Sequence, residues 1–103
     1  MSARDALSMA TVGGAGCLGR ADELGRLVVG HPADVTMWRL DGPAYAGVMD
    51  DPIEGWLRCG PTSAWYTIIN GQLVVAEGRL VSERLAEMLN RHRAISRRFQ
   101  PAT

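Results

Sequence analysis

The chain has 103 residues, with 11 basic and 11 acidic side chains and a formal net charge of zero. This length fits one domain or one piece of a larger domain, and the 47% hydrophobic and 21% charged residues are typical of a soluble globular chain. The zero net charge excludes a global basic field that would attract nucleic acid or an anionic membrane, and it leaves self-association unopposed.

The sequence contains no recognisable membrane or export signal. Its apolar runs are far shorter than the roughly 20 residues needed to span a bilayer, and its N-terminal residues lack the apolar core of a secretory signal. We therefore expect a cytoplasmic protein without a membrane partner. In a reducing cytoplasm, Cys17 and Cys59 are expected to be free thiols rather than a disulfide.

The first predicted element is a helix over Ala3–Leu18. Ser2 and Asp5 form a variant capping box at its start, and Gly19 is a suitable C-terminal stop. Small and apolar residues recur at helical spacing: Leu7, Ala10, Gly14, Cys17 and Leu18. Because each glycine of Gly13-Gly14 would weaken an isolated helix by ~1 kcal/mol, we expect the helix to lie close against another element there.

Two strands and a short helix are predicted to follow. Leu24–Val29 and Ala33–Leu40 have strand character, and Gly30-His31-Pro32 between them forms a turn. Asp51-Pro52 predicts the N-cap and first position of a helix that Gly60-Pro61 terminates. The apolar residues of this short helix, Ile53, Trp56 and Leu57, would share one face.

The clearest local signal is a β-hairpin. Trp65–Ile69 and Gln72–Ala76 flank Asn70-Gly71, and Asn-Gly favours the type I′ turn because it tolerates positive φ at both central positions. Glu77-Gly78-Arg79 predicts a second turn. A final helix over residues 82–99 is expected to begin at Ser82 as its cap, and its apolar stripe comprises Leu85, Met88, Leu89, His92, Ile95 and Phe99.

The glycines Gly14-Ala-Gly-Cys-Leu-Gly19 match the GxGxxG pattern of dinucleotide-binding loops. That pattern has to follow a strand and open a helix, so that the pyrophosphate meets free helix N–H groups. Here it ends a helical pattern and precedes a strand, which favours helix packing and termination over a cofactor site.

Metal-binding and catalytic patterns are equally weak. His31 and His92 are the only histidines, and zinc needs at least three converging protein ligands. Further oxygen and sulfur donors lack a ligand spacing: Asp34, Asp50, Asp51, Cys17 and Cys59. The serines lack a nucleophile elbow or triad context: Ser8, Ser63, Ser82 and Ser96. We therefore nominate no catalytic, cofactor-binding or metal-binding residue.

Two charge patterns have simple structural interpretations. Asp50-Asp51 is the adjacent acidic pair, and a helix cap at Asp51 is favoured over acid–base catalysis because sequence neighbours usually point apart. The basic cluster over Arg91–Arg98 favours a solvated helix face over an anion or RNA site, since Phe99 is the single nearby aromatic residue.

The order of three motifs resembles a known family. Ala6-Leu-Ser-Met-Ala-Thr-Val-Gly-Gly-Ala15 followed by Leu18-Gly19 resembles the last barrel helix of cytosine-deaminase-like amidohydrolases. Gly25-x-Leu-x-x-Gly30-x-x-Ala33-Asp34-Val35 resembles the strand pair that follows that helix, and Asn70-Gly71-x-x-Val74-Val75-x-x-Gly78 resembles the closing hairpin. Asp51-Pro52-Ile53 and Cys59-Gly60-Pro61 resemble the branch with 8-oxoguanine deaminase and hydroxytriazine aminohydrolases.

Two positions depart from the family pattern. Asp50 stands where that branch often has histidine, and His31 stands where the family usually has lysine after the turn glycine. The resemblance implies a parent enzyme with a (β/α)8 barrel, a small β-sandwich and one catalytic divalent metal, zinc or iron, whose bound hydroxide displaces ammonia from a ring carbon. The family's metal ligands lie upstream of the helix near Ala3, so none maps onto this chain.

We therefore expect an α+β chain of helix, strand pair, hairpin and C-terminal helix. Residues 1–103 would be a single domain or fragment, with 1–19 as the last barrel helix, 24–81 as a partial β-sandwich and 82–99 as the final helix. Its expected function is the structural C-terminal part of a nucleobase or triazine deaminase, inactive alone. The alternative is a freestanding homo-oligomeric module. Expected partners are a second copy and the missing barrel region, not nucleic acid or a membrane.

Overall fold

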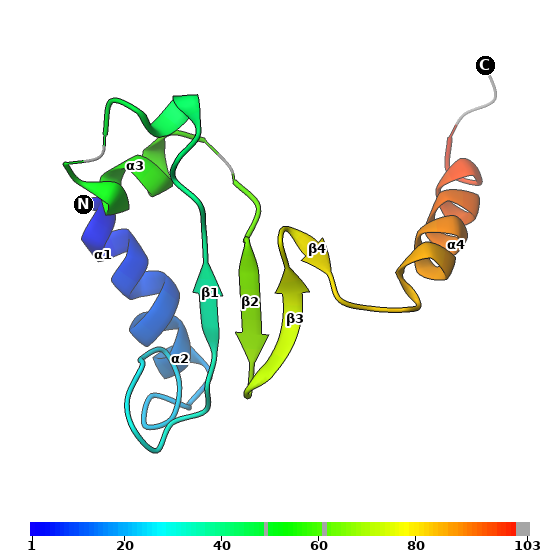
Figure 1. Cartoon of the computed structure of the whole chain (residues 1–103). Helices are drawn as coiled ribbons and strands as arrows, with labels where there is room; N and C mark the ends of the chain where they lie inside the picture. Colours follow the sequence, from blue (N-terminus) through cyan, green and yellow to red (C-terminus); the bar gives the residue numbers. More distant parts are fainter. Residues whose placement is uncertain (49, 61, 101–103) are drawn as a thin grey trace.

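The computed structural model describes residues 1–48, 50–60 and 62–100 and confirms the α+β class (Figure 1). The elements in chain order are α1 (Ala3–Ser8), the π-helix η1 (Met9–Gly13), α2 (Gly14–Cys17), β1 (Val35–Met37), the 3-10 helix η2 (Pro43–Tyr45), α3 (Pro52–Arg58), β2 (Tyr66–Ile69), β3 (Gln72–Ala76), β4 (Arg79–Leu80) and α4 (Leu85–Arg97). No helix within the described residues has the length and apolarity to cross a bilayer.

Helices α1, η1 and α2 form one continuous helix beside β1, as the spacing predicted (Figure 1). Its start is the predicted capping box, and it ends at Gly19, where φ is +69°. The expected close approach at Gly13-Gly14 is wrong, since every atom within 4 Å of a Cβ built there belongs to the same helix. The close approach occurs instead at Gly25, whose Cβ would lie 2.8 Å from the carbonyl oxygen of Thr11.

The predicted strand Leu24–Val29 is wrong. Its backbone makes local turn bonds, from Leu24 N to the Arg20 carbonyl and from His31 N to the Val28 carbonyl. Gly25, with φ of +84°, also turns the chain against the helix. Extended pairing therefore begins only at Val35, and the predicted strand Ala33–Leu40 shortens to β1.

The sheet is antiparallel throughout, in the order β1-β2-β3-β4. The predicted hairpin is confirmed: Asn70 and Gly71 have φ of 49° and 78°, and β3 matches its predicted bounds. A β-bulge between Thr67 and Ile68 shifts the register. The predicted second turn at Glu77-Gly78 also has positive φ at both residues, and it leads into β4.

Two short helical elements precede the sheet's central hairpin. Asp51 is the N-cap of α3 and Pro52 its first residue, as predicted. The termination signal at Gly60-Pro61 lies partly outside the described residues, because Pro61 is not described. Helix α3 contacts the residue that follows β1: the ring centroid of Trp56 lies 4.3 Å from that of Trp38.

Helix α4 begins later than predicted, at Leu85, and its N-cap is Arg84. Ser82 is not the cap because its hydroxyl accepts from Arg84 N at 3.3 Å, in the turn before the helix. Phe99 lies beyond the last helical residue, Arg97. In Figure 1, α4 stands away from the sheet at the end of an extended connection.

The described part of the chain has little core. Its buried hydrophobic residues are Ala3, Ala15 and Tyr45, and no large side chain there is fully buried. The radius of gyration is 17.6 Å, against about 13 Å for a compact domain of this length. The accessible surface is 8277 Å², whereas a compact monomer of this size exposes about 5,700 Å². The fold therefore leaves extensive surface uncovered.

Candidate functional site

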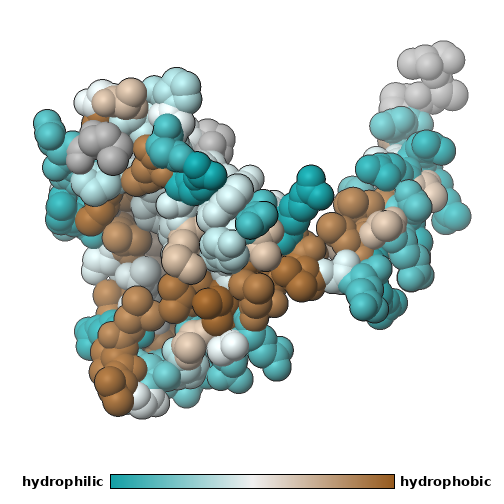
Figure 2. Space-filling view, viewed as in Figure 1, coloured by the Kyte–Doolittle hydropathy of each residue, from teal (hydrophilic) through white to brown (hydrophobic). Residues whose placement is uncertain are grey.

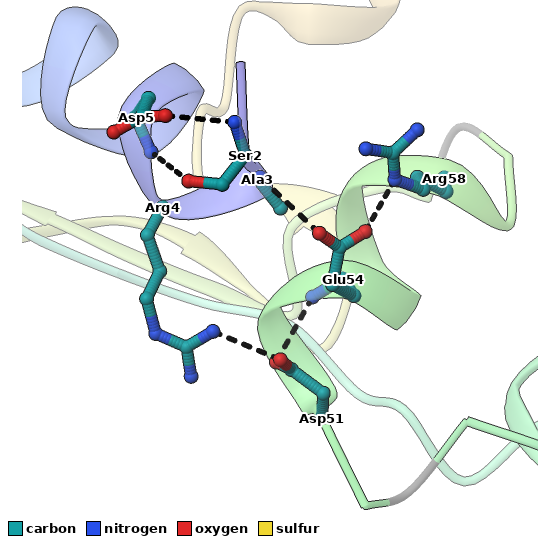
Figure 3. Close-up of polar contacts among 7 residues, drawn as sticks. All are labelled: Ser2, Ala3, Arg4, Asp5, Asp51, Glu54 and Arg58. Carbon is teal, nitrogen blue, oxygen red and sulfur yellow. Dashed lines mark hydrogen bonds and ion pairs between the residues drawn. The ribbon is translucent and has the colours of Figure 1, made fainter.

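The best-defined polar cluster joins the start of α1 to α3, and we call it the α1–α3 latch (Figure 3). Its members are Ser2, Ala3, Arg4, Asp5, Asp51, Glu54 and Arg58. Figure 3 shows that the contacts run between two helices whose residues lie far apart in the sequence. The latch is therefore a tertiary feature that gathers three carboxylates and two arginines at one end of α1.

Each helix first satisfies its own free N–H groups. The Ser2 hydroxyl accepts from Asp5 N at 3.1 Å, and Ser2 N donates to Asp5 Oδ2 at 2.7 Å. In α3, Asp51 Oδ1 accepts from Glu54 N at 3.3 Å. These carboxylates sit at the positive ends of the helices, where negative charge is stabilised.

Two contacts then link the helices. Arg4 Nη1 donates to Asp51 Oδ2 at 2.8 Å, and Ala3 N donates to Glu54 Oε1 at 3.3 Å. The second carboxylate oxygen of Glu54 accepts from Arg58 Nε, one turn further along α3. Local sequence patterns gave no signal for the inter-helix contacts, because the partners are separated by 47 and 51 residues.

The latch lowers the pKa of its three carboxylic acids. The hydrogen bond from Arg4 is the main cause for Asp51, and the one from Arg58 is the main cause for Glu54, with a further contribution from Ala3 N. Backbone donation by Ser2 lowers the pKa of Asp5. Hydrogen bonds to the charged form favour that form, so all three carboxylates stay ionised near neutral pH.

The latch is consequently a poor catalytic site. Both oxygens of Asp51 and both oxygens of Glu54 accept hydrogen bonds from the protein. A general base that works near neutral pH needs a pKa close to that pH, whereas the pKa values of Asp51 and Glu54 are lowered below their ordinary values. Among the sequence candidates, Asp51 is thus confirmed as a helix cap.

A second candidate is an open cleft of about 730 Å³ between the first helix, the 23–27 loop and β1. Its walls are mainly apolar, with Leu7, Leu27 and Trp38 among them. Its two carboxylates are already engaged: Asp34 Oδ1 accepts from Asn70 N at 2.7 Å, and Glu23 pairs with Arg20. The cleft therefore offers apolar surface rather than reactive groups.

A third candidate is a shallow cleft of about 510 Å³ along α4. Ser82, Glu87 and His92 all line it, which brings together the residue types of a hydrolytic triad. No hydrogen bond joins these three described side chains, so the arrangement lacks the geometry of an activated nucleophile. Arg84 and Arg91 lie in the same cleft and make the helix face basic.

The remaining sequence candidates do not converge. His31 lies in the turn before β1 and its Nδ1 is buried without a hydrogen-bond partner in the described part of the chain, whereas His92 lies in α4. Cys17 and Cys59 are unbonded thiols. Within residues 1–48, 50–60 and 62–100, no three His, Cys, Asp or Glu side chains are grouped closely enough to hold a metal ion. The Gly14–Gly19 pattern closes a helix, with no preceding strand.

Comparison with known proteins places this arrangement in a family. The model of the amidohydrolase family matches residues 1–81, and the chain belongs to that family. It is 36% identical over 89 residues to 8-oxoguanine deaminase from Pseudomonas aeruginosa, covering 86% of this chain and 19% of that protein. It is 33% identical over 102 residues to 5-methylthioadenosine/S-adenosylhomocysteine deaminase from Syntrophobacter fumaroxidans, covering 98% and 23%.

A solved structure extends the likeness to three dimensions. The chain resembles a mutant of atrazine chlorohydrolase from Arthrobacter aurescens TC1, solved with zinc and atraton, with a TM-score of 0.83 and 42% identity. The match covers 92% of this chain and 21% of that one. The chain thus spans about one fifth of the length of the relatives that it matches.

Proposed function

We propose that this chain is the structural C-terminal part of a metal-dependent amidohydrolase, a hydrolase acting on non-peptide carbon–nitrogen bonds in nucleobases or triazines. In this proposal α1–α2 is the last helix of the catalytic barrel, and the sheet is part of a small β-sandwich. The observation that carries it is the TM-score of 0.83 over 92% of the chain against one fifth of atrazine chlorohydrolase.

The uncovered surface supports this interpretation. The chain exposes roughly 2,600 Å² more than a compact monomer of its size would, which is in the range of permanent protein interfaces. Figure 2 shows a continuous apolar band from the loop before β1 across the sheet to β4. Exposed residues consistent with that band are Leu27, Val28, Val29, Ile69, Leu73, Leu80 and Val81. A barrel and further strands would cover such a surface.

The described residues do not fit the catalytic metal of the proposed enzyme. The latch carboxylates already accept hydrogen bonds from arginines and backbone N–H groups, and the two histidines lie in different parts of the fold. We therefore assign the metal to the barrel region and no catalytic step to this chain. Its own contribution is to pack against the barrel and hold the sheet in place.

A second candidate function is a homo-oligomeric interaction module, and the exposed apolar band favours it. Two copies would bury part of that band in a two-fold interface, the commonest solution for self-association. Sedimentation equilibrium of the chain alone and in complex with a separately expressed barrel region distinguishes the two. A dimer that the barrel region does not dissociate would favour the module.

The decisive test is a chimera. The matched fifth of Arthrobacter atrazine chlorohydrolase is replaced by this whole chain, and bound zinc and atrazine hydrolysis are measured. We expect a folded chimera that holds zinc and hydrolyses atrazine, because the two pieces share their arrangement in space. The control is the same enzyme with the matched fifth deleted, which should lose zinc and activity. A folded chimera without zinc or activity would contradict the proposal.

The isolated chain provides the complementary measurement. We expect no stoichiometric zinc or iron after dialysis and no ammonia release from 8-oxoguanine, cytosine, guanine or hydroxytriazines, because no metal-binding group is assembled among the described residues. Activity that co-purifies with the chain and disappears in His31→Ala or His92→Ala would overturn a purely structural role.

A further inference from the structure

The latch has a defined position if α1 is a barrel helix, and this step rests on the proposed function. In a (β/α)8 barrel each loop after a strand leads into the N-terminus of the next helix, and these loops build the active site at one face. Ser2 is the N-cap of α1, so it would mark that face. The C-terminal end of α2, near Cys17, would lie at the opposite, non-catalytic face.

The latch ties a later segment to this same end of the helix. Arg4 bonds Asp51 at 2.8 Å and Ala3 N bonds Glu54 at 3.3 Å, so α3 lies against the start of α1 (Figure 3). Packing reinforces the position: Gly55 is buried, and a Cβ there would lie 2.5 Å from Val48 Cγ2. We name residues 43–48 and 50–59 the rim segment.

We propose that the rim segment forms part of the wall at the mouth of the assembled enzyme's active site and takes part in selecting its substrate. Several residues of the segment pack within the fold: Tyr45 and Gly55 are buried, and Trp56 contacts Trp38. Leu57 is the large apolar side chain of α3 that remains exposed, at 39%. An apolar side chain there suits the alkyl substituents or ring edge of a planar nitrogen heterocycle.

The role of Arg4 in this proposal is positional. Its guanidinium and Asp51 form the ion pair between the helix start and the rim segment, and both side chains are partly exposed, at 61% and 39%. An exposed ion pair contributes little to global stability. Its loss should therefore leave the fold intact. Because the pair is one of the hydrogen bonds that link α1 to α3, its loss should still shift the rim segment.

The test uses the chimera with this whole chain. We measure kcat/KM for atrazine and for its analogue without N-alkyl groups, together with bound zinc and the thermal midpoint. For Leu57→Ala we expect the ratio of kcat/KM for atrazine to kcat/KM for the analogue to change at least threefold. The change should arise in KM, and the amount of bound zinc should stay the same. Arg4→Ala should move the ratio in the same direction, and Arg4→Lys should restore part of it.

The matched control is Leu89→Ala, because Leu89 is also a helical leucine exposed at 39%, but in α4. It should leave the substrate ratio unchanged. The chimera could hold zinc and hydrolyse atrazine while the Leu57 and Arg4 variants leave the substrate ratio unchanged. That result would overturn the role of the rim segment in substrate selection alone. A chimera without zinc and activity would instead contradict the proposed function and the rim assignment with it.

Discussion

The α1–α3 latch and helix α4 differ in which side chains find partners within the chain. In the latch, charged and polar groups from two distant segments satisfy one another within the chain. In α4, most of the apolar stripe is exposed: Met88, Leu89 and Ile95 are 53%, 39% and 49% exposed, and Leu85 is only partly buried. The latch thus satisfies its polar groups within the chain, whereas α4 presents apolar side chains to solvent. This division is expected of a part that packs into a larger structure, because apolar burial supplies the main driving force of association.

The sheet lies between these extremes. Its hairpin is fixed by turn chemistry and by contacts with the residues before β1, whereas the described residues bury few of its side chains. Local order without a deep core implies that backbone geometry and hydrogen bonds specify this region. The following changes test that contrast, from the largest expected effect to the smallest.

Gly25→Ala should have the largest effect. The new Cβ would lie 2.8 Å from the Thr11 carbonyl oxygen, in a backbone with φ of +84°, and we expect a loss of roughly 2–3 kcal/mol in the free energy of unfolding. Circular dichroism during thermal unfolding measures it. The control is Gly16→Ala, which has open space around its Cβ and should stabilise the helix by up to ~1 kcal/mol. Equal midpoints for both variants would contradict the contact.

Gly71→Val should have the next largest effect. It places a β-branched side chain at φ of 78° in the hairpin turn, which should destabilise the chain by more than ~1 kcal/mol. Gly47→Ala is the matched control, since its Cβ has open space and its φ is not positive. An unchanged unfolding midpoint for Gly71→Val would mean that the turn does not constrain the sheet.

Asp34→Ala should follow. It removes the acceptor of the 2.7 Å hydrogen bond from Asn70 N, which ties the hairpin turn to the chain before β1, and we expect a loss of ~1 kcal/mol. Asp34→Asn keeps an acceptor oxygen and should recover most of the stability. Amide exchange at Asn70 reports the bond directly, and equal protection in all three proteins would count against it.

The latch should respond to acid. The folded-state pKa values of Asp51 and Glu54 are lowered by Arg4 and Arg58, respectively, so the stability they contribute is present above their ordinary values and is lost as pH falls below about 4. Because these side chains are partly exposed, thermal midpoints between pH 3 and 7 should show only a small loss, and Arg4→Gln should reduce it. Arg93→Gln, in α4, is the control. Identical acid profiles for all proteins would contradict the role of Arg4.

Leu89→Asp should have the smallest effect on folding. Helix α4 stands apart from the sheet (Figure 1) and Leu89 is exposed. The free energy of unfolding should therefore change by no more than about 0.5 kcal/mol. Ile68→Asp, in the partly buried centre of the sheet, should be clearly destabilising by comparison. A large loss for Leu89→Asp would show that α4 packs on its own chain after all.

Whether a sequence prediction was confirmed depended largely on how far apart in the sequence the interacting residues are. The capping box at Ser2, the cap at Asp51 and the Asn70-Gly71 turn depend on residues within a few positions, and all three are confirmed. The α+β class and the amidohydrolase family also followed from the sequence. The missed cap of α4 was a local error, because Ser82 stabilises a turn instead of the helix start.

Features that depend on residues far apart in the sequence could be read only from the tertiary structure. Residues 24–29 have strand-forming side chains, yet Gly25 folds them against Thr11 and their backbone bonds become local turns. The pairing of Arg4 with Asp51 and the capping of Asn70 by Asp34 join segments 47 and 36 residues apart. Backbone conformation at caps and tight turns is set by neighbouring residues, whereas a helix–helix contact exists only once the chain has brought both surfaces together.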